Sequence, residues 1–162
     1  MSATDEYLAH NARYVESFTG RLPTAPSKAV AVVACMDSRL NVFAALGLAD
    51  GEAHVIRNAG GVVTDDVIRS LAISQRLLGT REVIVIHHTG CGLLTITDEQ
   101  FARTLQAETG HTPLWRAHAF TDLEDDVRDS LRLIRDSPFL PATDAVRGFV
   151  FDVATGGLTE VR

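Results

Sequence analysis

Four short apolar runs divide the chain, and the longer stretches between them mix apolar and polar residues with helical spacing. Residues 29–34 are all small and apolar, and residues 53–56, 83–86 and 149–153 form further runs rich in apolar side chains. Short continuous runs of this kind favour strands that are buried on both faces of a parallel sheet. The pattern therefore predicts four strands in one central sheet.

The stretch between the second and third runs has the periodicity and the end signals of a helix. Residues 65–78 place apolar side chains at spacings that a helix would bury on one side. Thr64 can cap the start of this helix, and Gly79 follows its end. A helix of this length is the crossover that a pair of parallel strands needs.

Two further helices are predicted, over residues 98–108 and from about residue 123 to residue 135. The apolar stripe of the second helix consists of Val127, Leu131 and Ile134. Its first turn carries the acidic residues Glu124, Asp125 and Asp126. We interpret this acidic turn as solvated, because negative charge is favourable at the N-terminal end of the helix dipole.

Together these elements predict a single α/β domain with a mainly parallel sheet, in the strand order 2-1-3-4, flanked by helices. The prediction leaves room for an additional antiparallel edge strand. Residues 1–28 are interpreted as an N-terminal helical arm and connector, and residues 29–162 as the domain itself. A helix over residues 7–18 has little apolar surface of its own. An arm that packs on a partner subunit is one interpretation of this segment.

Composition narrows the class of protein. With 162 residues, 46% hydrophobic and 22% charged, the chain has the size and composition of one globular domain. Its formal net charge of -6 argues against a nucleic-acid-binding face, which needs a basic patch. We find no signal peptide and no apolar run that could span a bilayer, and therefore predict a cytoplasmic protein that is not bound to a membrane.

Both cysteines lie in motifs with further chemistry. Cys35 precedes Met-Asp-Ser-Arg, and Cys91 follows His88-Thr-Gly. Thiolates and imidazole are ligands that zinc prefers, and three protein ligands leave one coordination position for water or substrate. A disulfide or two inert thiols are the alternatives, but a cytosolic setting favours metal ligation. We therefore predict one catalytic Zn²⁺ per chain, held by Cys35, His88 and Cys91.

The predicted topology explains how these distant residues meet. Ligands of an open parallel sheet bind beyond the carboxyl ends of its strands, where the strand order reverses. Cys35 lies just past the first predicted strand and His88 just past the third, and these two strands are neighbours in the order 2-1-3-4. Cys91 would follow in a tight turn in which Gly90 and Gly92 remove side-chain obstruction. Backbone N–H groups of this turn, around Gly90 and Gly92, are candidate contacts to the substrate.

Asp37 and Arg39 are a candidate catalytic pair. They lie two residues apart in the loop that leaves the first strand, which is close enough for a charge-assisted, bidentate interaction. An aspartate held by arginine stays ionised at neutral pH and can accept a hydrogen bond from zinc-bound water. The pair could instead form an ordinary salt bridge, as most neighbouring Asp and Arg residues do. If Arg39 released it, Asp37 could also become the fourth zinc ligand.

Four motifs in order resemble those of the β-class carbonic anhydrases. They are Cys35-x-Asp-Ser-Arg, Arg57-Asn-Ala-Gly, Ser70-Leu and His88-x-x-Cys-Gly. The resemblance is strong from residue 29 to residue 94, and it implies reversible hydration of carbon dioxide to bicarbonate by a homodimer or a higher homo-oligomer. It also implies zinc ligands at Cys35, His88 and Cys91 and a catalytic pair at Asp37 and Arg39. The compact branch that the chain resembles includes carbonyl sulfide hydrolases.

Other interpretations remain at this point. Carbonyl sulfide could be the substrate of the same site, and a zinc-stabilised or nucleotide-binding module without catalysis is a second class. The first strand is followed by Cys35-Met36-Asp37 rather than a Gly-x-Gly-x-x-Gly motif, which disfavours nucleotide binding. We interpret His87 as a packing or surface residue, because strand alternation points it away from His88. We interpret residues 57–61 as a strand-ending turn that forms a cleft wall as a consequence.

Overall fold

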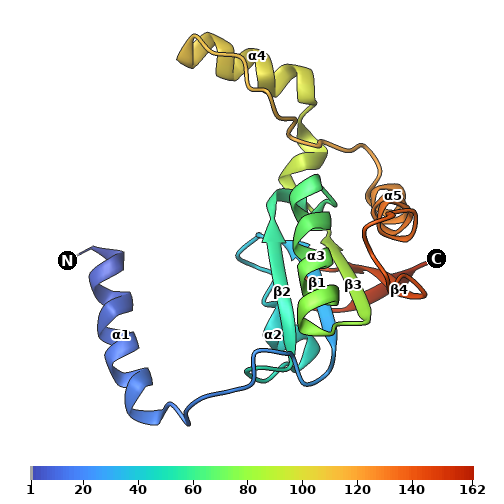
Figure 1. Cartoon of the computed structure of the whole chain (residues 1–162). Coiled ribbons are helices and arrows are strands. Elements are labelled where there is room, and N and C mark those ends of the chain that lie inside the picture. Colours follow the sequence, from blue (N-terminus) through green and yellow to red (C-terminus); the bar gives the residue numbers. More distant parts are fainter. Residues whose placement is uncertain (1) are drawn as a thin grey trace.

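A computed structural model describes residues 2–162 of the chain. Five strands form one sheet with helices on both faces (Figure 1). The elements in chain order are α1 (Ala3–Ser17), β1 (Val30–Cys35), α2 (Val42–Leu46), β2 (Ala53–Asn58), the 3₁₀ helix η1 (Ala59–Gly61), α3 (Asp65–Leu78), β3 (Glu82–His88), the 3₁₀ helix η2 (Gly92–Thr95), α4 (Asp98–Thr109), α5 (Leu123–Arg135), β4 (Ala145–Phe151) and β5 (Leu158–Val161). No helix in residues 2–162 has the length and apolar content needed to cross a membrane.

The strand order confirms the predicted topology. The sheet runs β2-β1-β3-β4-β5, with the first four strands parallel and β5 antiparallel to β4. In the central strand β1, Ala34 pairs with Arg57 of β2 on one side and with Ile86 of β3 on the other. The carboxyl ends of β1, β2 and β3 therefore finish at the same edge of the sheet.

Two apolar layers enclose the sheet. Ala31 and Val33 of β1 face a core shared with α3 and α5, whereas Val32 and Ala34 face the opposite side, which packs against α2 and the segment around η2. All four side chains are inaccessible to solvent. This explains why the first apolar run is continuous: both faces of β1 are buried.

The two helices that cover the face of Ala31 and Val33 lie where the sequence predicted them. Helix α3 spans Asp65–Leu78, with the Thr64 side chain accepting a hydrogen bond from the N–H of Val67 and Gly79 ending the helix at φ 76°. Helix α5 spans Leu123–Arg135, and its stripe Val127, Leu131 and Ile134 is buried. Periodicity combined with capping residues was sufficient to locate both helices.

The strands differ from the predictions at their ends. The fourth strand is Ala145–Phe151 rather than 149–153, because its first half carries the exposed Arg147 and the buried Gly148, which break the apolar run. The first and third strands extend further than predicted, so Cys35 and His88 are the last residues of β1 and β3 instead of lying just past them. The short helices α2, η1 and η2 were not predicted.

Helix α1 is longer than predicted, and it meets the domain at a hydrogen bond of 3.1 Å from the Tyr14 hydroxyl to Asp50. It starts at Ala3 because Ser2 and Asp5 form a capping box, in which each side chain binds the other residue's backbone N–H. None of its residues is buried, and an extended segment joins it to β1 (Figure 1). Just before β1, the chain makes a turn in which the Pro26 carbonyl accepts a hydrogen bond from the Ala29 N–H.

Candidate metal centre

Three potential metal ligands converge at the carboxyl ends of β1 and β3. Cys35 ends β1, His88 ends β3, and Cys91 follows in the turn before η2. One ligand atom of each residue, two Sγ atoms and a ring nitrogen, lies within 4.8 Å of the other two, and all three residues are buried. With the usual Zn–S bond length of about 2.3 Å, tetrahedral zinc would place its two sulfur ligands about 3.8 Å apart. Among the residues described, this is the one such cluster of His, Cys, Asp or Glu.

A hydrogen bond at one ring nitrogen of His88 leaves the other nitrogen available to a metal. Nδ1 of His88 lies 3.0 Å from the carbonyl oxygen of Thr89, which can only accept, so the ring proton is on Nδ1. Nε2 is then a bare acceptor, and it is buried without a hydrogen-bond partner. An unpaired buried nitrogen that faces two thiols fits a metal ion, and the Thr89 contact is the kind of outer interaction that fixes a ligating histidine.

The second thiol also fits a cation. Burial raises the pKa of the Cys91 thiol, and the proximity of Cys35 raises it further. The backbone N–H of Leu93 partly opposes this effect by binding the sulfur. A thiol that is difficult to ionise alone is deprotonated when it coordinates a metal, so ion binding would overcome this cost.

Asp37 and Arg39 form the bidentate pair that their spacing indicated. Arg39 donates from Nε to Oδ1 at 2.9 Å, from a terminal nitrogen to Oδ2 at 2.7 Å, and from its backbone N–H to Oδ1 at 2.9 Å. These hydrogen bonds, first those of the side chain, hold the pKa of the Asp37 carboxyl well below its usual range. Oδ2 lies 3.6 Å from Nε2 of His88, so an ionised carboxylate borders the ligand cluster.

The glycine turn contributes one contact to this arrangement. The Gly90 carbonyl oxygen accepts a hydrogen bond of 3.2 Å from Arg39. Gly90 has φ 64°, a conformation that favours glycine, and Gly92 lines the cavity next to Cys91. The turn thus ties the loop after β1 to the loop after β3. Contact of its N–H groups with a substrate stays a prediction.

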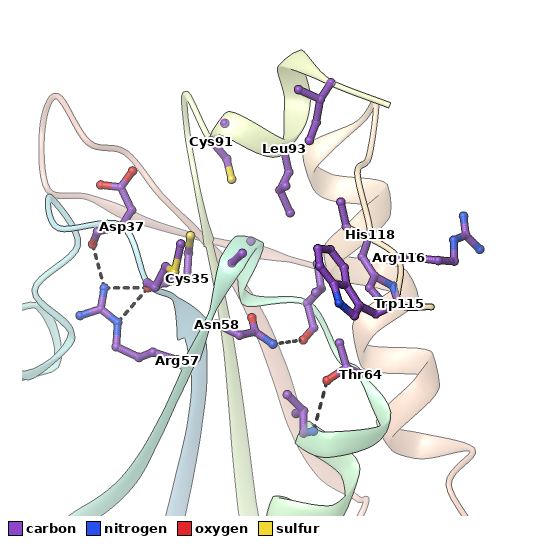
Figure 2. A pocket seen from close by; sticks show the side chains of 18 of the residues that line it. Cys35, Asp37, Arg57, Asn58, Thr64, Cys91, Leu93, Trp115, Arg116 and His118 are labelled. Atoms are coloured by element: carbon purple, nitrogen blue, oxygen red, sulfur yellow. Dashed lines mark hydrogen bonds between the residues drawn. The ribbon is translucent and has the colours of Figure 1, made fainter. Parts of the chain in front are cut away.

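Arg57 is a site residue whose role the sequence did not reveal. Its guanidinium donates two hydrogen bonds to the Cys35 carbonyl, at 2.9 and 2.7 Å, and one of 2.8 Å to the Asp37 carbonyl (Figure 2). One side chain at the end of β2 therefore fixes the backbone of a metal-ligand candidate and of the candidate catalytic aspartate. The neighbouring Asn58 ends the same strand and donates to the Val62 carbonyl at 2.9 Å.

The cluster opens into a cavity of about 720 Å³. Its walls include Leu93 on one side and, from the segment after α4, Trp115, Arg116 and His118 (Figure 2). Asp98 holds this segment by accepting hydrogen bonds from Arg116 Nε at 2.7 Å and from the Ala119 N–H at 2.9 Å. The segment has no regular secondary structure, and sequence patterns gave no signal that it borders the site.

His87 is a packing residue, as one of its two interpretations had it, whereas the acidic turn of α5 differs from expectation. His87 is fully buried, and Nδ1 lies 3.2 Å from Oδ2 of Asp126. Asp126 is half-buried rather than fully solvated, with Oδ2 inaccessible to solvent, whereas Glu124 and Asp125 are exposed as expected. Burial raises the pKa of Asp126 to about 6 and lowers the pKa of His87 to about 4. Both shifts arise because burial disfavours the charged form of each group.

Comparison with known proteins places this geometry in context. The carbonic anhydrase family model matches residues 30–138. The protein named beta-carbonic anhydrase 1 of Mycobacterium tuberculosis is 61% identical over 161 residues, which cover 99% of each chain. A protein named carbon disulfide hydrolase, from an Acidianus species, is 32% identical over 148 residues and covers 76% of this chain and 72% of its own. The crystal structure of carbonic anhydrase from Streptococcus mutans superposes with a TM-score of 0.94, at 46% identity, over 100% of this chain and 99% of that one.

Proposed function

The chain belongs to the β-carbonic anhydrase family, and from this premise we propose that it catalyses the reversible hydration of carbon dioxide to bicarbonate at a zinc ion held by Cys35, His88 and Cys91. The observation that carries the proposal is the bare, buried Nε2 of His88 beside two buried thiols. When bound, the ion would supply an acidified water molecule as the nucleophile. One ion per chain matches the three converging ligands.

Asp37 is suited to orient the reacting water. Its Oδ1 already accepts two hydrogen bonds from Arg39, whereas Oδ2 accepts one. Oδ2 therefore keeps an acceptor position, and it is the oxygen that lies 3.6 Å from Nε2 of His88. Because Arg39 keeps the carboxylate ionised, Asp37 can accept a hydrogen bond from water without taking up the proton. This would aim a lone pair of the water at the carbon of a linear substrate.

The aspartate could instead close the site. If Arg39 released Asp37, its carboxylate could become a fourth ligand and exclude water. Three hydrogen bonds from Arg39 and the Arg57 contact to the Asp37 carbonyl oppose that movement. We therefore propose that the resting site is open. A structure of the zinc-loaded protein at low and at high pH tests this, since a closed site would show Asp37 rotated away from Arg39.

Replacement of Asp37 separates metal binding from catalysis. Asp37→Asn keeps the shape but loses the charge, and Asp37→Ala removes the acceptor entirely. With zinc content measured on each protein, we expect both variants to retain zinc and to lose about 10- to 100-fold in kcat/KM, the usual effect of losing an outer-shell partner. Wild-type rates in zinc-loaded Asp37→Ala would rule out the proposed role.

The two thiolates also predict the pH dependence. They neutralise the ion's charge, so the bound water should ionise above the value of about 7 found at sites with three histidines. We expect kcat/KM for carbon dioxide to rise towards alkaline pH. A flat profile from about pH 6 to 9, with zinc bound throughout, would contradict this assignment.

Carbonyl sulfide hydrolysis, giving hydrogen sulfide and carbon dioxide, is the second candidate. Two observations favour it: a relative is named carbon disulfide hydrolase, and the cavity has apolar walls, including Leu93 and Trp115, which suit the less polar substrate. Turnover of carbon dioxide, carbonyl sulfide and carbon disulfide should be measured side by side on one zinc-loaded preparation. A kcat/KM for carbon dioxide below that for carbonyl sulfide would reverse our order.

We also propose a homodimer in the cytoplasm. Helix α1 has no buried residue but carries exposed apolar side chains, among them Tyr7, Leu8 and Tyr14. The sheet face packed against α2 is only partly covered, since Val30 and Val55 are half-buried. Sedimentation velocity on the full chain should give a dimer, and Leu8→Asp, at an exposed apolar position, should weaken it. A monomer at micromolar concentration would contradict the proposal.

A further inference from the structure

His87 lies directly beside a metal-ligand candidate but faces away from it. Successive strand residues point to opposite faces, so His88 faces the cluster and His87 faces the layer of α5. The His87 ring is inaccessible to solvent and stacks on Phe120, with ring centroids 5.7 Å apart. A fully buried histidine needs partners for both of its ring nitrogens.

The partners of His87 fix where its protons are. Nε2 lies 3.2 Å from the carbonyl oxygen of Gly61, which can only accept, so Nε2 carries a proton and donates it. Nδ1 lies 3.2 Å from Oδ2 of Asp126. Neither of these buried atoms makes a hydrogen bond in the structure, and a proton shared between them would satisfy both. Burial raises the pKa of Asp126, which favours the acid as the source of that proton.

Gly61 connects this pair to the metal centre. It ends η1, and its position is tightly enclosed: an added Cβ would lie 2.7 Å from the backbone nitrogen of Cys35 and 3.0 Å from the carbonyl oxygen of Ile86. The turn is therefore wedged between the ends of β1 and β3. Asn58 and Gly60, in and beside the same turn, line the cavity. The carbonyl group of Gly61 is held by the side chain of His87.

We propose that His87, oriented by Asp126, is a positioning residue that holds the η1 turn against Cys35 and thereby fixes the geometry of the metal centre. The pair touches neither the ligand atoms nor the cavity walls directly, so it acts through the Gly61 carbonyl. This inference rests on the proposed zinc-dependent function. It assigns a role to His87 and to Asp126, neither of which is a metal-ligand candidate.

Two pairs of variants test the hydrogen bond to Gly61 and the contact with Asp126. His87→Phe removes the donor to Gly61, whereas His87→Gln places an amide N–H near the position of Nε2. Asp126→Leu removes the partner of Nδ1, whereas Asp126→Asn keeps an uncharged donor there. Leu131→Val is the control, because it weakens the core that α5 forms without touching the network. Each protein is made at full length and loaded with zinc.

The main measurement is the rate at which zinc dissociates into excess chelator, at a temperature well below unfolding, with kcat/KM for carbon dioxide and the melting temperature measured alongside. We expect His87→Phe and Asp126→Leu to release zinc about fivefold faster and to lose about fivefold in kcat/KM. That factor is about 1 kcal/mol, the size of one hydrogen bond. His87→Gln and Asp126→Asn should recover most of both losses. Leu131→Val should melt earlier with an unchanged zinc rate.

Several outcomes overturn the inference. If folded His87→Phe and Asp126→Leu release zinc at the wild-type rate and differ only in melting temperature, the pair is merely structural. If His87→Gln behaves like His87→Phe, the Nε2 donor is not the cause. Should His87→Phe fail to fold, imidazole ¹⁵N–¹H spectra of the wild type remain decisive: a His87 Nε2 without a proton refutes the arrangement. Failure of the proposed function is distinct, since the wild type itself would then lack zinc-dependent turnover.

Discussion

Replacement of Gly61 with alanine should destabilise the protein and loosen its metal centre. Gly61 has φ 74°, a conformation that costs an alanine about 1–2 kcal/mol. The added Cβ would also lie 2.7 Å from the Cys35 nitrogen and 3.0 Å from the Ala34 carbonyl carbon. These atoms are backbone and cannot rotate away, so overpacking adds about 1–3 kcal/mol. The expected total is about 2–5 kcal/mol.

Gly79 supplies the matched control. It ends α3 at φ 76° with no atom within 4 Å of an added Cβ, so Gly79→Ala should cost only the backbone share of about 1–2 kcal/mol. Urea unfolding of zinc-free protein gives both values without a contribution from metal binding. Gly61→Ala should be the less stable variant by about 1–3 kcal/mol, and it should bind zinc more weakly. Equal stability of the two variants would refute the reasoning about the enclosed turn.

Three further predictions concern other contacts. Gly148→Ala places a Cβ against Val127 and Leu131 of α5, so urea unfolding should show a loss of about 1–3 kcal/mol of stability with unchanged zinc affinity. Adding Val127→Ala to this variant should recover part of the lost stability. Arg57→Met removes the three hydrogen bonds to the Cys35 and Asp37 carbonyls, and kcat/KM should fall about tenfold in stopped-flow assays. An unchanged kcat/KM would mean that the loop after β1 holds its shape without Arg57. Hydrogen bonds, first from the Ala119 N–H and then from Arg116, lower the pKa of Asp98 below its ordinary 3.8. The ionised carboxylate therefore stabilises the fold fully above about pH 4, and this contribution is lost as the pH falls. Asp98→Asn should be about 1 kcal/mol less stable than wild type at pH 7, and acid unfolding should show the gap closing towards pH 2.

Local patterns were sufficient for the parts of the fold whose causes are local. Helix α3 could be located because Thr64, its apolar stripe and Gly79 lie within one short stretch. The meeting of Cys35 and His88 could be inferred because parallel topology aligns strand ends. The fourth strand was misplaced because Gly148 is small for a tertiary reason, the close approach of α5, which no local pattern encodes.

The rest of the site depends on contacts between distant residues. The segment with Trp115 borders the cavity because Asp98 holds it, and one aspartate among many gives no such signal. The partial burial of Asp126 had a usable clue, since it lies four residues before the buried Ser130 and eight before Ile134, on the edge of the predicted stripe. Its acidic neighbours Glu124 and Asp125, which are exposed, concealed that clue.

The most direct test of the account is stopped-flow hydration of carbon dioxide during removal and restoration of zinc. The wild-type rate should fall to the buffer rate when a chelator removes the metal, and it should return in proportion to added zinc until one ion per chain is bound. Cys35→Ser should bind zinc poorly and recover little activity. An equal rate in metal-free protein, or a zinc-loaded protein no faster than buffer, would contradict the central claim.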